Sequence, residues 1–535
     1  MKKIYITLFT LVLAMMAMVY FYFSNLDTQN NNHDLSLNAV AANSGLIFCL
    51  RNDKDIVNIL SGQDYFQKLV GANTSKQLTA LKENILSIGT VSNLMIDRKV
   101  YIGFLPAGKR TNDYLLCTEL VGKEDHITLI NTLKSAKVRV DSISGGFKLT
   151  TKDSSIFYLG IKENLLVLSG SNQPMLNALN STATQASTNF VSYIKSAGKF
   201  GKNSLANLYI DYNRFPQLLK AVIPNTLDGE LSVFNKQDSY AVLNYNFSKE
   251  RVFFNGSSVI NNHNSYLSLF TSAAPLKNAI DNILPANTAN FTLYAIADYT
   301  TWHKSLQQWF TANKDHGKVK KTITSANQKY RLNLDQIFPK YFKNQFINFQ
   351  LKTTEKIGAV QLTNGDKVSQ LLLDISENYN DDIKLLKEPD LLYCYFGEPF
   401  KKFRKPYYII IDNYMVFSNY ASTLQTFLNN YRNNQLLVNE KDYINLYNQI
   451  ANNATVTFYV NHKNSDNLIL NTFYTDYYRY FESEDGFKDF ISLIYQLSGD
   501  KGSFQTNFLI NTIPKITQDS TLNQLTDEEI LPISK

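Results

Sequence analysis

The chain has 535 residues, of which 44% are hydrophobic and 19% charged, and its formal net charge at pH 7 is +7. This balance is typical of globular proteins and excludes a disordered chain, while the length exceeds that of one ordinary domain. A charge this small, without a nucleic-acid-binding motif, also argues against DNA or RNA as a partner. Aromatic residues make up 13% of the chain, which favours β-strands.

The first 23 residues predict a transmembrane signal anchor. Lys2 and Lys3 precede an uncharged run from Ile4 to Phe23, which is long enough to cross a bilayer as a helix. Aromatic residues end this run where a cleavage site would need small ones, so we expect an uncleaved anchor; a cleaved signal peptide is the alternative. The lysines should stay on the inner side of the membrane. Residues 24–45 are polar and aperiodic, and we expect a juxtamembrane linker there.

Three cysteines are spread along the chain at Cys49, Cys117 and Cys394. Their number and spacing fit neither a disulfide scaffold nor a zinc cluster. Cys117 and Cys394 lie in apolar, strand-like runs, where a thiol usually serves as a small buried hydrophobic group. A bridge between Cys49 and Cys117 in an oxidising compartment stays open as an alternative.

The segment GFLPAGKRT, Gly103–Thr111, resembles the phosphate-binding pattern GxxxxGK[ST]. Gly103, Gly108 and Lys109 are in register with that pattern. Arg110, however, replaces the hydroxyl residue that would hold magnesium.

The residues that follow also argue against a phosphate-binding loop. Such a loop is followed directly by a helix, whereas Tyr114–Leu120 has the pattern of a strand. In the second part of the chain, Gly365 aligns with Gly108 and an aspartate aligns with the lysine. We therefore predict a turn between two strands, with the glycine required by the turn.

The second part of the chain repeats the first at low identity. Three pairs of segments recur in the same order after 249 or 250 positions: Phe157–Asn180 with Pro406–Asn429, Asn207–Asn213 with Thr457–Lys463, and Phe253–Asn261 with Ser503–Asn511. The first pair aligns without gaps and has seven identical positions. Nearly constant spacing predicts a tandem duplication.

Each copy combines strands joined by Asn- or Gly-centred turns with amphipathic helices, such as SLQQWF at Ser305–Phe310. We predict an α+β fold in which each copy is a mostly antiparallel sheet with helices packed on one face. The predicted boundaries are the anchor at 1–23, the linker at 24–45, the first repeat at 46–284, the second repeat at 285–512 and a polar C-terminal tail at 513–535.

Polar residues at predicted strand ends, at Asn52, Asp211, Asp298 and Asn461, each precede a predicted helix, and we expect them to cap it. The six histidines form no zinc-binding pair, and no GxSxG motif accompanies them. The sequence therefore predicts no catalytic, cofactor-binding or metal-binding residue.

Two features remain as partner or ligand contacts. Trp302 and Trp309 share one face of a predicted helix, where core packing is the simpler interpretation and an exposed binding platform is the alternative. Basic clusters occur at Lys318, Lys320 and Lys321, and again at Lys401, Lys402, Arg404 and Lys405. Solvated loops are the simpler interpretation of these clusters, and contact with anionic lipid or acidic polysaccharide is the alternative.

The repeated segment Phe157–Asn180 and the segment NLYIDYNRFPQLL, Asn207–Leu219, behind a single anchor, resemble an uncharacterised family of bacterial membrane-anchored envelope proteins. The resemblance covers most of residues 45–512. It implies a single-pass protein of the bacterial inner membrane whose ectodomain lies in the periplasm. It supplies no active site, cofactor or metal.

We accordingly predict a non-enzymatic binding or assembly module whose partner is an envelope protein, a lipid or a polysaccharide. The alternatives are an envelope hydrolase with an unusual site between the two repeats, and a purely structural scaffold of the envelope. Convergent acidic or histidine side chains with shifted pKa values in a cleft would favour the hydrolase.

Overall fold

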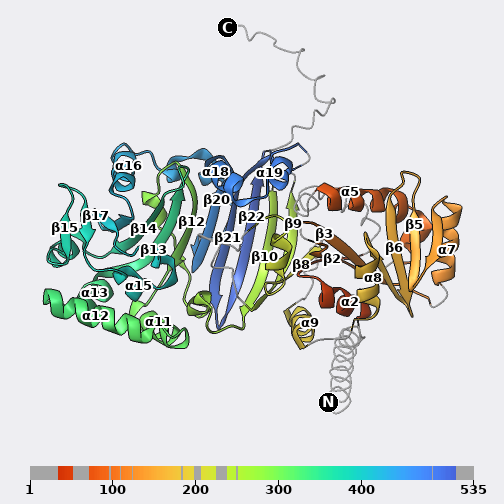
Figure 1. Ribbon diagram of the computed structural model, residues 1–535, viewed down its shortest axis with the longest axis horizontal. Coiled ribbons are helices and arrows are strands. Elements are labelled where there is room, and N and C mark those ends of the chain that lie inside the picture. The colour runs from red at the N-terminus through yellow and green to blue at the C-terminus, as the bar shows by residue number, and fades with distance from the viewer. Residues whose placement is uncertain are drawn as a thin grey trace, which may run out of the picture.

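A computed structural model describes residues 34–51, 72–95, 98–108, 110–122, 125–181, 185–197, 206–224, 238–248, 251–484 and 486–513. Figure 1 shows an elongated molecule in which a single sheet runs from one end to the other. The predicted anchor and all but the first residue of the predicted C-terminal tail lie outside these ranges. Within these ranges, no helix has both the length and the apolarity needed to span a bilayer.

The sheet contains 20 strands, and every pairing between them is antiparallel. Its first half has the order β4-β5-β6-β7-β3-β2-β1-β8-β9-β10. The strands of this half are β1 (Leu46–Arg51), β2 (Lys99–Pro106), β3 (Asn112–Glu119), β4 (Arg139–Ile143), β5 (Gly146–Thr150), β6 (Ile156–Lys162), β7 (Leu165–Ser169), β8 (Ala206–Asp211), β9 (Ser239–Ser248) and β10 (Arg251–Ile260).

The second half has the order β15-β16-β17-β18-β14-β13-β12-β20-β21-β22, which repeats the order of the first half strand for strand. Its strands are β12 (Thr288–Ala295), β13 (Phe342–Leu351), β14 (Lys356–Leu362), β15 (Ser376–Asn378), β16 (Lys384–Leu386), β17 (Tyr407–Ile411), β18 (Tyr414–Ser418), β20 (Val456–Asn461), β21 (Phe490–Asp500) and β22 (Ser503–Thr512). A separate small sheet pairs β11 (Leu276–Lys277) with β19 (Asn453–Ala454).

The two halves join where β10 pairs with β22. Asn255 is the fifth residue of β10 and Asn507 is the fifth residue of β22, and these two residues lie directly opposite each other. By strand position, Arg251 therefore corresponds to Ser503, whereas the sequence alignment pairs Phe253 with Ser503. The two correspondences differ by two residues. A shift of two keeps every side chain on its face of the sheet, so the alternating pattern could not reveal it.

Helices cover both faces of the sheet, so the prediction of helices on one face is wrong. In Figure 1, α5 lies on one side of the first-half strands and α2 and α9 lie on the other. The helices of one face are α2 (Leu35–Asn43), α8 (Asn172–Leu179) and α9 (Gln185–Ala197), and those of the other are α5 (Ala72–Leu81), α6 (Gly89–Asn93), α7 (Asp125–Ser135) and α10 (Phe215–Leu219).

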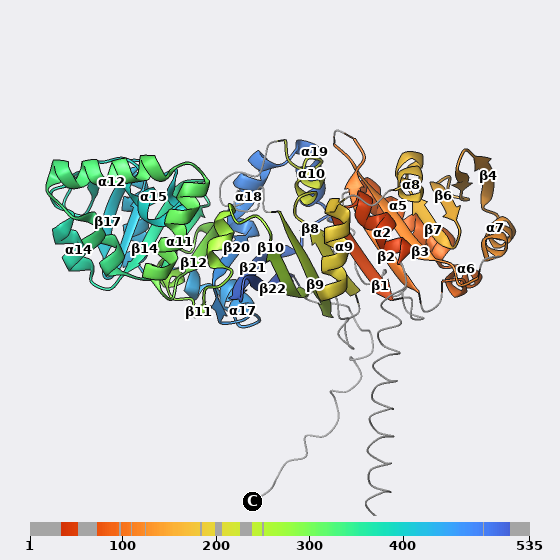
Figure 2. The ribbon, with the colours of Figure 1, turned by 90° about the horizontal axis from the view of Figure 1, so that it is seen from below.

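The second half has the same two layers. One face carries α16 (Ala421–Arg432) and α17 (Lys441–Tyr447), and the other carries α11 (Tyr299–Ala312), α12 (His316–Tyr330), α13 (Phe338–Tyr341), α14 (Gly365–Leu371) and α15 (Leu391–Phe396). Over the middle of the sheet, α18 (His462–Thr472) and α19 (Thr475–Phe481) come close to α10 (Figure 2), and Tyr474 N donates to Val222 O over 2.9 Å.

Burial on both faces follows from apolar runs in the strands. In β1, Ile47 and Cys49 enter one core cluster, whereas Phe48 and Leu50 enter the cluster on the opposite face. A strand buried on both sides reads as a continuous apolar run rather than as an alternation. The alternating pattern that led to the one-face prediction belongs to the central strands β9, β10, β21 and β22.

The linker prediction is wrong for its last residues, because Leu35–Asn43 forms α2. Asp34 caps this helix by accepting a hydrogen bond from Leu37 N over 2.8 Å. Leu37, Val40 and Ala41 are buried in the core of the first half. They have the i, i+3, i+4 spacing of one helix face.

The segment GFLPAGKRT forms the end of β2 and the turn into β3, as predicted. Ala107 N donates to Thr111 O over 2.9 Å across this turn, while Lys109 lies outside the described residues. The alignment of Gly365 with Gly108 is wrong, because Gly365 begins α14 behind its cap Asn364. The β13–β14 turn instead spans residues 352–355.

Two of the predicted helix caps are confirmed. Asp298 accepts from Thr300 N and Thr301 N at the start of α11, and Asn461 accepts from Asn464 N at the start of α18. Asp211 instead accepts from Asn213 N in a turn before α10, and Asn52 lies outside the described residues. Capping is local, which explains why the sequence predicts it well.

Cys49, Cys117 and Cys394 are buried and unbridged. Cys49 of β1 and Cys117 of β3 both lie opposite Tyr101 in the strand register, and β2, which carries Tyr101, runs between β1 and β3. Because neighbouring strands lie about 4.8 Å apart, the two thiols are separated by about two strand spacings, which is too far for a disulfide. Burial raises the pKa of the Cys49 thiol to about 12.

Candidate functional site

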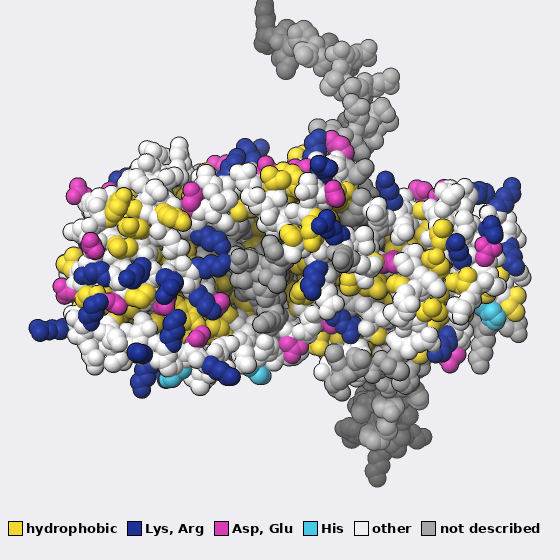
Figure 3. Space-filling view, in the orientation of Figure 1, with side chains coloured by type: hydrophobic (Ala, Val, Ile, Leu, Met, Phe, Trp, Pro, Cys, Tyr) yellow, Lys and Arg dark blue, Asp and Glu magenta, His cyan; other side chains and the backbone are white. Residues whose placement is uncertain are grey.

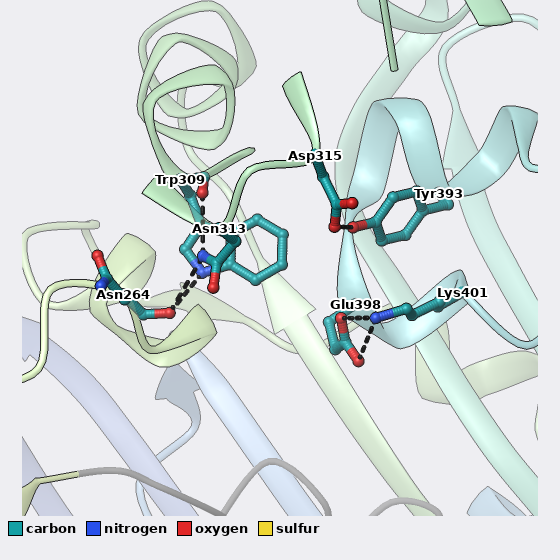
Figure 4. A network of polar contacts seen from close by, with 7 residues as sticks. All are labelled: Asn264, Trp309, Asn313, Asp315, Tyr393, Glu398 and Lys401. Carbon is teal, nitrogen blue, oxygen red and sulfur yellow. Dashed lines mark hydrogen bonds and ion pairs between the residues drawn. The ribbon is translucent and has the colours of Figure 1, made fainter. Parts of the chain in front are cut away.

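Trp302 and Trp309 fill the core between α11 and the sheet, with exposures of only 4% and 7%. The indole Nε1 of Trp309 donates to Asn264 O over 2.8 Å (Figure 4). Trp302 packs against Phe270 and Phe346. The interpretation of these rings as an exposed platform is therefore wrong, because the apolar face of α11 turns toward the sheet.

The two basic clusters, which lie some 80 residues apart in the sequence, meet on one surface. Lys318 Nζ of α12 lies 3.1 Å from Asp390 Oδ2, and Arg404 Nε lies 3.3 Å from Asp390 Oδ1. The Asp390 side chain is 11% exposed, whereas those of Lys318 and Arg404 are 62% and 74% exposed. One largely buried carboxylate thus holds one cation from each cluster at the surface.

Asp390 occupies a specialised backbone position. It has a φ of 63° and precedes α15, and its N–H donates to Arg404 O over 2.8 Å. Asparagine and aspartate are the residues other than glycine that most readily adopt this left-handed conformation. The main chain therefore fixes the carboxylate between the two basic segments.

A second contact joins the basic segments at the other end of α12. Glu388 accepts from Lys329 Nζ and, over 2.8 Å, from Tyr330 Oη. The hydrogen bond from Lys329 holds the pKa of the Glu388 carboxyl below its usual range. Lys405 adds a further favourable charge to this carboxylate.

A third contact lies at the beginning of α12 (Figure 4). Tyr393 Oη donates to Asp315 Oδ2 over 2.7 Å, and Lys401 Nζ lies 5.7 Å from the centre of the Tyr393 ring. Lys401 also pairs with Glu398 at 3.2 Å. The segment from 387 to 405 therefore runs along α12 and is attached to it at three places.

We call the cations of α12 and of residues 387–405 the basic surface. Its members are Lys318, Lys320, Lys321 and Lys329 of α12 and Lys387, Lys401, Lys402, Arg404 and Lys405 of the adjoining segment. Figure 3 shows lysine and arginine side chains gathered at this end of the molecule. Ion pairs join Lys318 and Arg404 to Asp390, Lys329 to Glu388, and Lys401 to Glu398.

The chemistry of the basic surface is the recognition of anions. Lys401, Lys402, Arg404 and Lys405 are all exposed. Several ammonium groups and one guanidinium attract phosphate, sulfate or carboxylate groups, and an arginine can hold such a group through two parallel hydrogen bonds. The surface is therefore chemically suited to binding an anion.

Three buried carboxyl groups elsewhere have raised pKa values, in each case chiefly because burial disfavours the charged form: Asp113, Asp211 and Asp281. Asp281 accepts from Tyr443 Oη over 2.7 Å, and Asp211 lies 3.7 Å from the Arg214 guanidinium. They lie on separate elements: Asp113 in β3, Asp211 in β8 and Asp281 in the 3₁₀ helix Ile280–Ile283. Where the structure describes the chain, no three His, Cys, Asp or Glu residues gather as metal ligands would.

His462 forms a link that sequence reasoning missed. Its Nδ1 lies 2.7 Å from Phe490 O, and its Nε2 lies 2.9 Å from Glu482 Oε1. The imidazole thus ties the start of α18 to the end of α19 and to the start of β21. Its position after a capping asparagine was visible in the sequence, but both partners are set by the tertiary fold.

The counter-ions Glu388 and Asp390 were also missed. Both lie in the segment KEPD, more than ten residues before the second basic cluster, and the sequence offered no other signal. Neither that signal nor the spacing of the lysines shows that α12 lies alongside this segment, because no local rule relates residues 80 positions apart.

No protein-family model matches the chain, and no curated protein matches it either. A solved chain from a structure titled "Structure of crystal form III of TP0453" matches 45% of this chain and 89% of its own length at 9% identity. The TM-score of that match is 0.23, which is too low to support an argument about fold or function.

Proposed function

We propose that this chain is a membrane-anchored binding module of the bacterial envelope whose basic surface binds an acidic polysaccharide. The observation that carries the proposal is the meeting of Lys318 and Arg404 on Asp390. This shared carboxylate brings the two basic segments together on one surface. The anchor and the periplasmic location remain expectations from the sequence.

A polysaccharide fits this surface better than a lipid bilayer does. Proteins that bind at a bilayer interface usually insert apolar side chains beside their cations. None of the large hydrophobic side chains that are exposed in the described ranges belongs to α12 or to residues 387–405: Val121, Ile127, Ile156, Leu373, Tyr379, Tyr420, Ile444, Leu470 and Ile513.

We also propose that the two halves arose by duplication of one unit, with copies at 46–284 and 285–512. The support is the identical pairing order of the strands and the opposition of Asn255 and Asn507 at the same strand position. In a symmetric pair, the residue on the symmetry axis faces its own counterpart. The basic surface belongs to the second copy, so duplication would have allowed that copy to specialise.

The test is binding of the purified full-length protein to immobilised dextran sulfate and polygalacturonate, in parallel with vesicles of phosphatidylglycerol and phosphatidylcholine. The triple variant Lys401→Gln, Lys402→Gln, Lys405→Gln should bind the polysaccharides roughly tenfold more weakly, because each exposed contact contributes a modest amount. Binding of the unchanged protein should also weaken with added salt.

The matched control removes three exposed lysines from the first half: Lys134→Gln, Lys152→Gln and Lys195→Gln. It changes the net charge by the same amount and should bind as the unchanged protein does. Equal binding by the two triple variants would overturn the proposal, and binding to the vesicles alone would replace the polysaccharide with a lipid surface.

A further inference from the structure

A hollow of about 450 Å³ opens in the second half, where the segment before β12 meets the connection between α16 and α17. Six polar side chains line it: Asn287, Asn430, Asn434, Gln435, Asn439 and Glu440. It adjoins the α16–α17 face of the sheet, whereas the basic surface lies on the face that carries α12 and α15. The hollow and the basic surface are therefore separate sites.

Main-chain hydrogen bonds hold the rim of the hollow. Ala286 N donates to Gln435 O over 2.9 Å, and Leu437 N donates to Leu284 O over 2.8 Å. Asn439 Nδ2 donates to Asn434 O over 3.0 Å across the connection. Asn434 has a φ of 54°, a conformation that asparagine tolerates after the end of a helix. The site is thus formed before any ligand arrives.

Several side chains in the hollow have unused hydrogen-bonding capacity. The Oδ1 atom of Asn287 is buried and has no partner among the described residues. Asn430, Gln435 and Glu440 make no side-chain hydrogen bond with any described residue. Asn287 Oδ1 is closed to solvent, so the exposed side chains of Gln435 and Glu440 are the ones available to a ligand.

The donor set defines the ligand class. Each amide side chain offers both N–H donors and a carbonyl acceptor, and the Glu440 carboxylate accepts two or more hydrogen bonds. Hydroxyl groups both donate and accept, so they complement this set. No lysine, arginine or histidine lines the hollow, and Glu440 would repel an anion. The volume lies within the usual range of about 300–1,000 Å³ for small-molecule sites.

We propose that this hollow, hereafter the amide pocket, binds a neutral, polyhydroxylated ligand of the carbohydrate class. Leu436 supplies an apolar side chain at the rim, against which the C–H face of a sugar ring can pack. The inference is independent of the proposed function, because it uses no residue of the basic surface and requires no anion.

The test uses the purified full-length protein with maltose, cellobiose and chitobiose as probes, followed by saturation-transfer NMR and calorimetry. At least one probe should bind in a calcium-free buffer. The double variant Asn430→Ala, Gln435→Ala should bind that probe about tenfold more weakly, because two hydrogen-bonding amides are lost. Glu440→Gln, which leaves the shape of the pocket almost unchanged, should also weaken binding.

Asn433→Ala is the control variant, since Asn433 is exposed in the same connection but does not line the pocket. Its affinity should equal that of the unchanged protein, and melting curves should show that all variants remain folded. The proposal would be overturned by the absence of binding to every probe, by equal binding of the double variant and the control, or by binding of calcium without a sugar.

Discussion

Asn255 of β10 lies directly opposite Asn507 of β22, at the middle of the ladder that joins the two halves of the sheet. On their other edges, β10 pairs with β9 and β22 pairs with β21. The hydrogen bonds of one half therefore continue without interruption into the other. Damage to the central ladder should accordingly affect the stability of both halves.

Gly256, which follows Asn255 in β10, tests the close approach of β10 to its other neighbour, β9. A Cβ atom at this position would lie 2.1 Å from Val242 O and 2.9 Å from Leu243 Cα, which are main-chain atoms of β9. Gly256→Val should lower the free energy of unfolding by about 1–3 kcal/mol, because the strands must move apart. Urea denaturation followed by circular dichroism measures the change.

Gly317 provides the control for Gly256. It lies in the first turn of α12, and an added Cβ would meet nothing within 4 Å. Gly317→Ala should leave stability unchanged or raise it by up to about 1 kcal/mol, because alanine favours a helix. Equal stabilities for Gly256→Val and the unchanged protein would contradict the close approach of β9 and β10.

Asp390→Asn should strengthen binding to dextran sulfate, if the proposed function is correct. The substitution removes the negative charge shared by Lys318 and Arg404 and leaves both cations available to the polymer. Asparagine tolerates the φ of 63° at this position, so the main chain should keep its course. On a dextran sulfate column, the variant should elute at a higher salt concentration than the unchanged protein. Elution at the same concentration would contradict the role given to this surface.

His303 should make the protein less stable in mild acid. Its ring stacks on Tyr299 and Tyr395 and lies close to Gln307, and burial lowers the pKa of its imidazole, an effect that Asp335 partly opposes. The unfolded chain therefore takes up a proton near pH 6.5 while the folded chain resists it, so stability is lost as the pH falls below about 6.5.

The variant His303→Phe isolates this effect because it retains an aromatic ring and cannot be protonated. Its loss of stability between pH 7.5 and pH 5 should be smaller than that of the unchanged protein. Denaturation at both pH values provides the comparison, and parallel losses in the two proteins would rule out a contribution from His303.

Asp281 should have the opposite pH dependence. Burial raises the pKa of its carboxyl, so the folded state favours the protonated form, and its contribution to stability is lost as the pH rises through the folded-state value. Asp281→Asn cannot ionise, so its stability relative to the unchanged protein should improve between pH 4 and pH 8. Chemical denaturation at both pH values measures this difference. A constant difference would exclude ionisation of Asp281 as the cause.

Tyr443→Phe is the companion variant, because Tyr443 Oη donates to the Asp281 carboxyl. Removal of this hydroxyl leaves the buried Asp281 carboxyl with one hydrogen-bond donor fewer. The free energy of unfolding should fall by about 1–3 kcal/mol at neutral pH. Tyr443→Phe should lower the free energy of unfolding by a smaller amount when it is introduced into the Asp281→Asn variant. The reason is that a neutral amide at position 281 depends less on the tyrosine donor than a carboxylate does.

Local features of the fold were predictable from the sequence. Asp298 and Asn461 cap helices as expected, since a cap involves only residues two or three positions apart. The β2–β3 turn is likewise set by residues within it. Helix α2 was missed although its signal is local, because it is only nine residues long and the segment before it is polar.

The candidate site was only partly predictable. The sequence shows that Lys318 and Arg404 belong to basic clusters, but not that Asp390 joins them. It shows that Trp302 and Trp309 share a helix face, but burial depends on what that face meets. The amide pocket escaped prediction altogether, because asparagine-rich connections are common in this chain and only their meeting creates a hollow.

The sequence by itself therefore determined the α+β class, the antiparallel pairing and the spacing of the repeated segments. These follow from local propensity and from order along the chain. The tertiary structure decided the burial of both sheet faces, the continuity of the sheet at Asn255 and Asn507, and the assembly of the basic surface. Those features depend on contacts between residues far apart in the chain, and such contacts are selected by packing rather than by any local pattern.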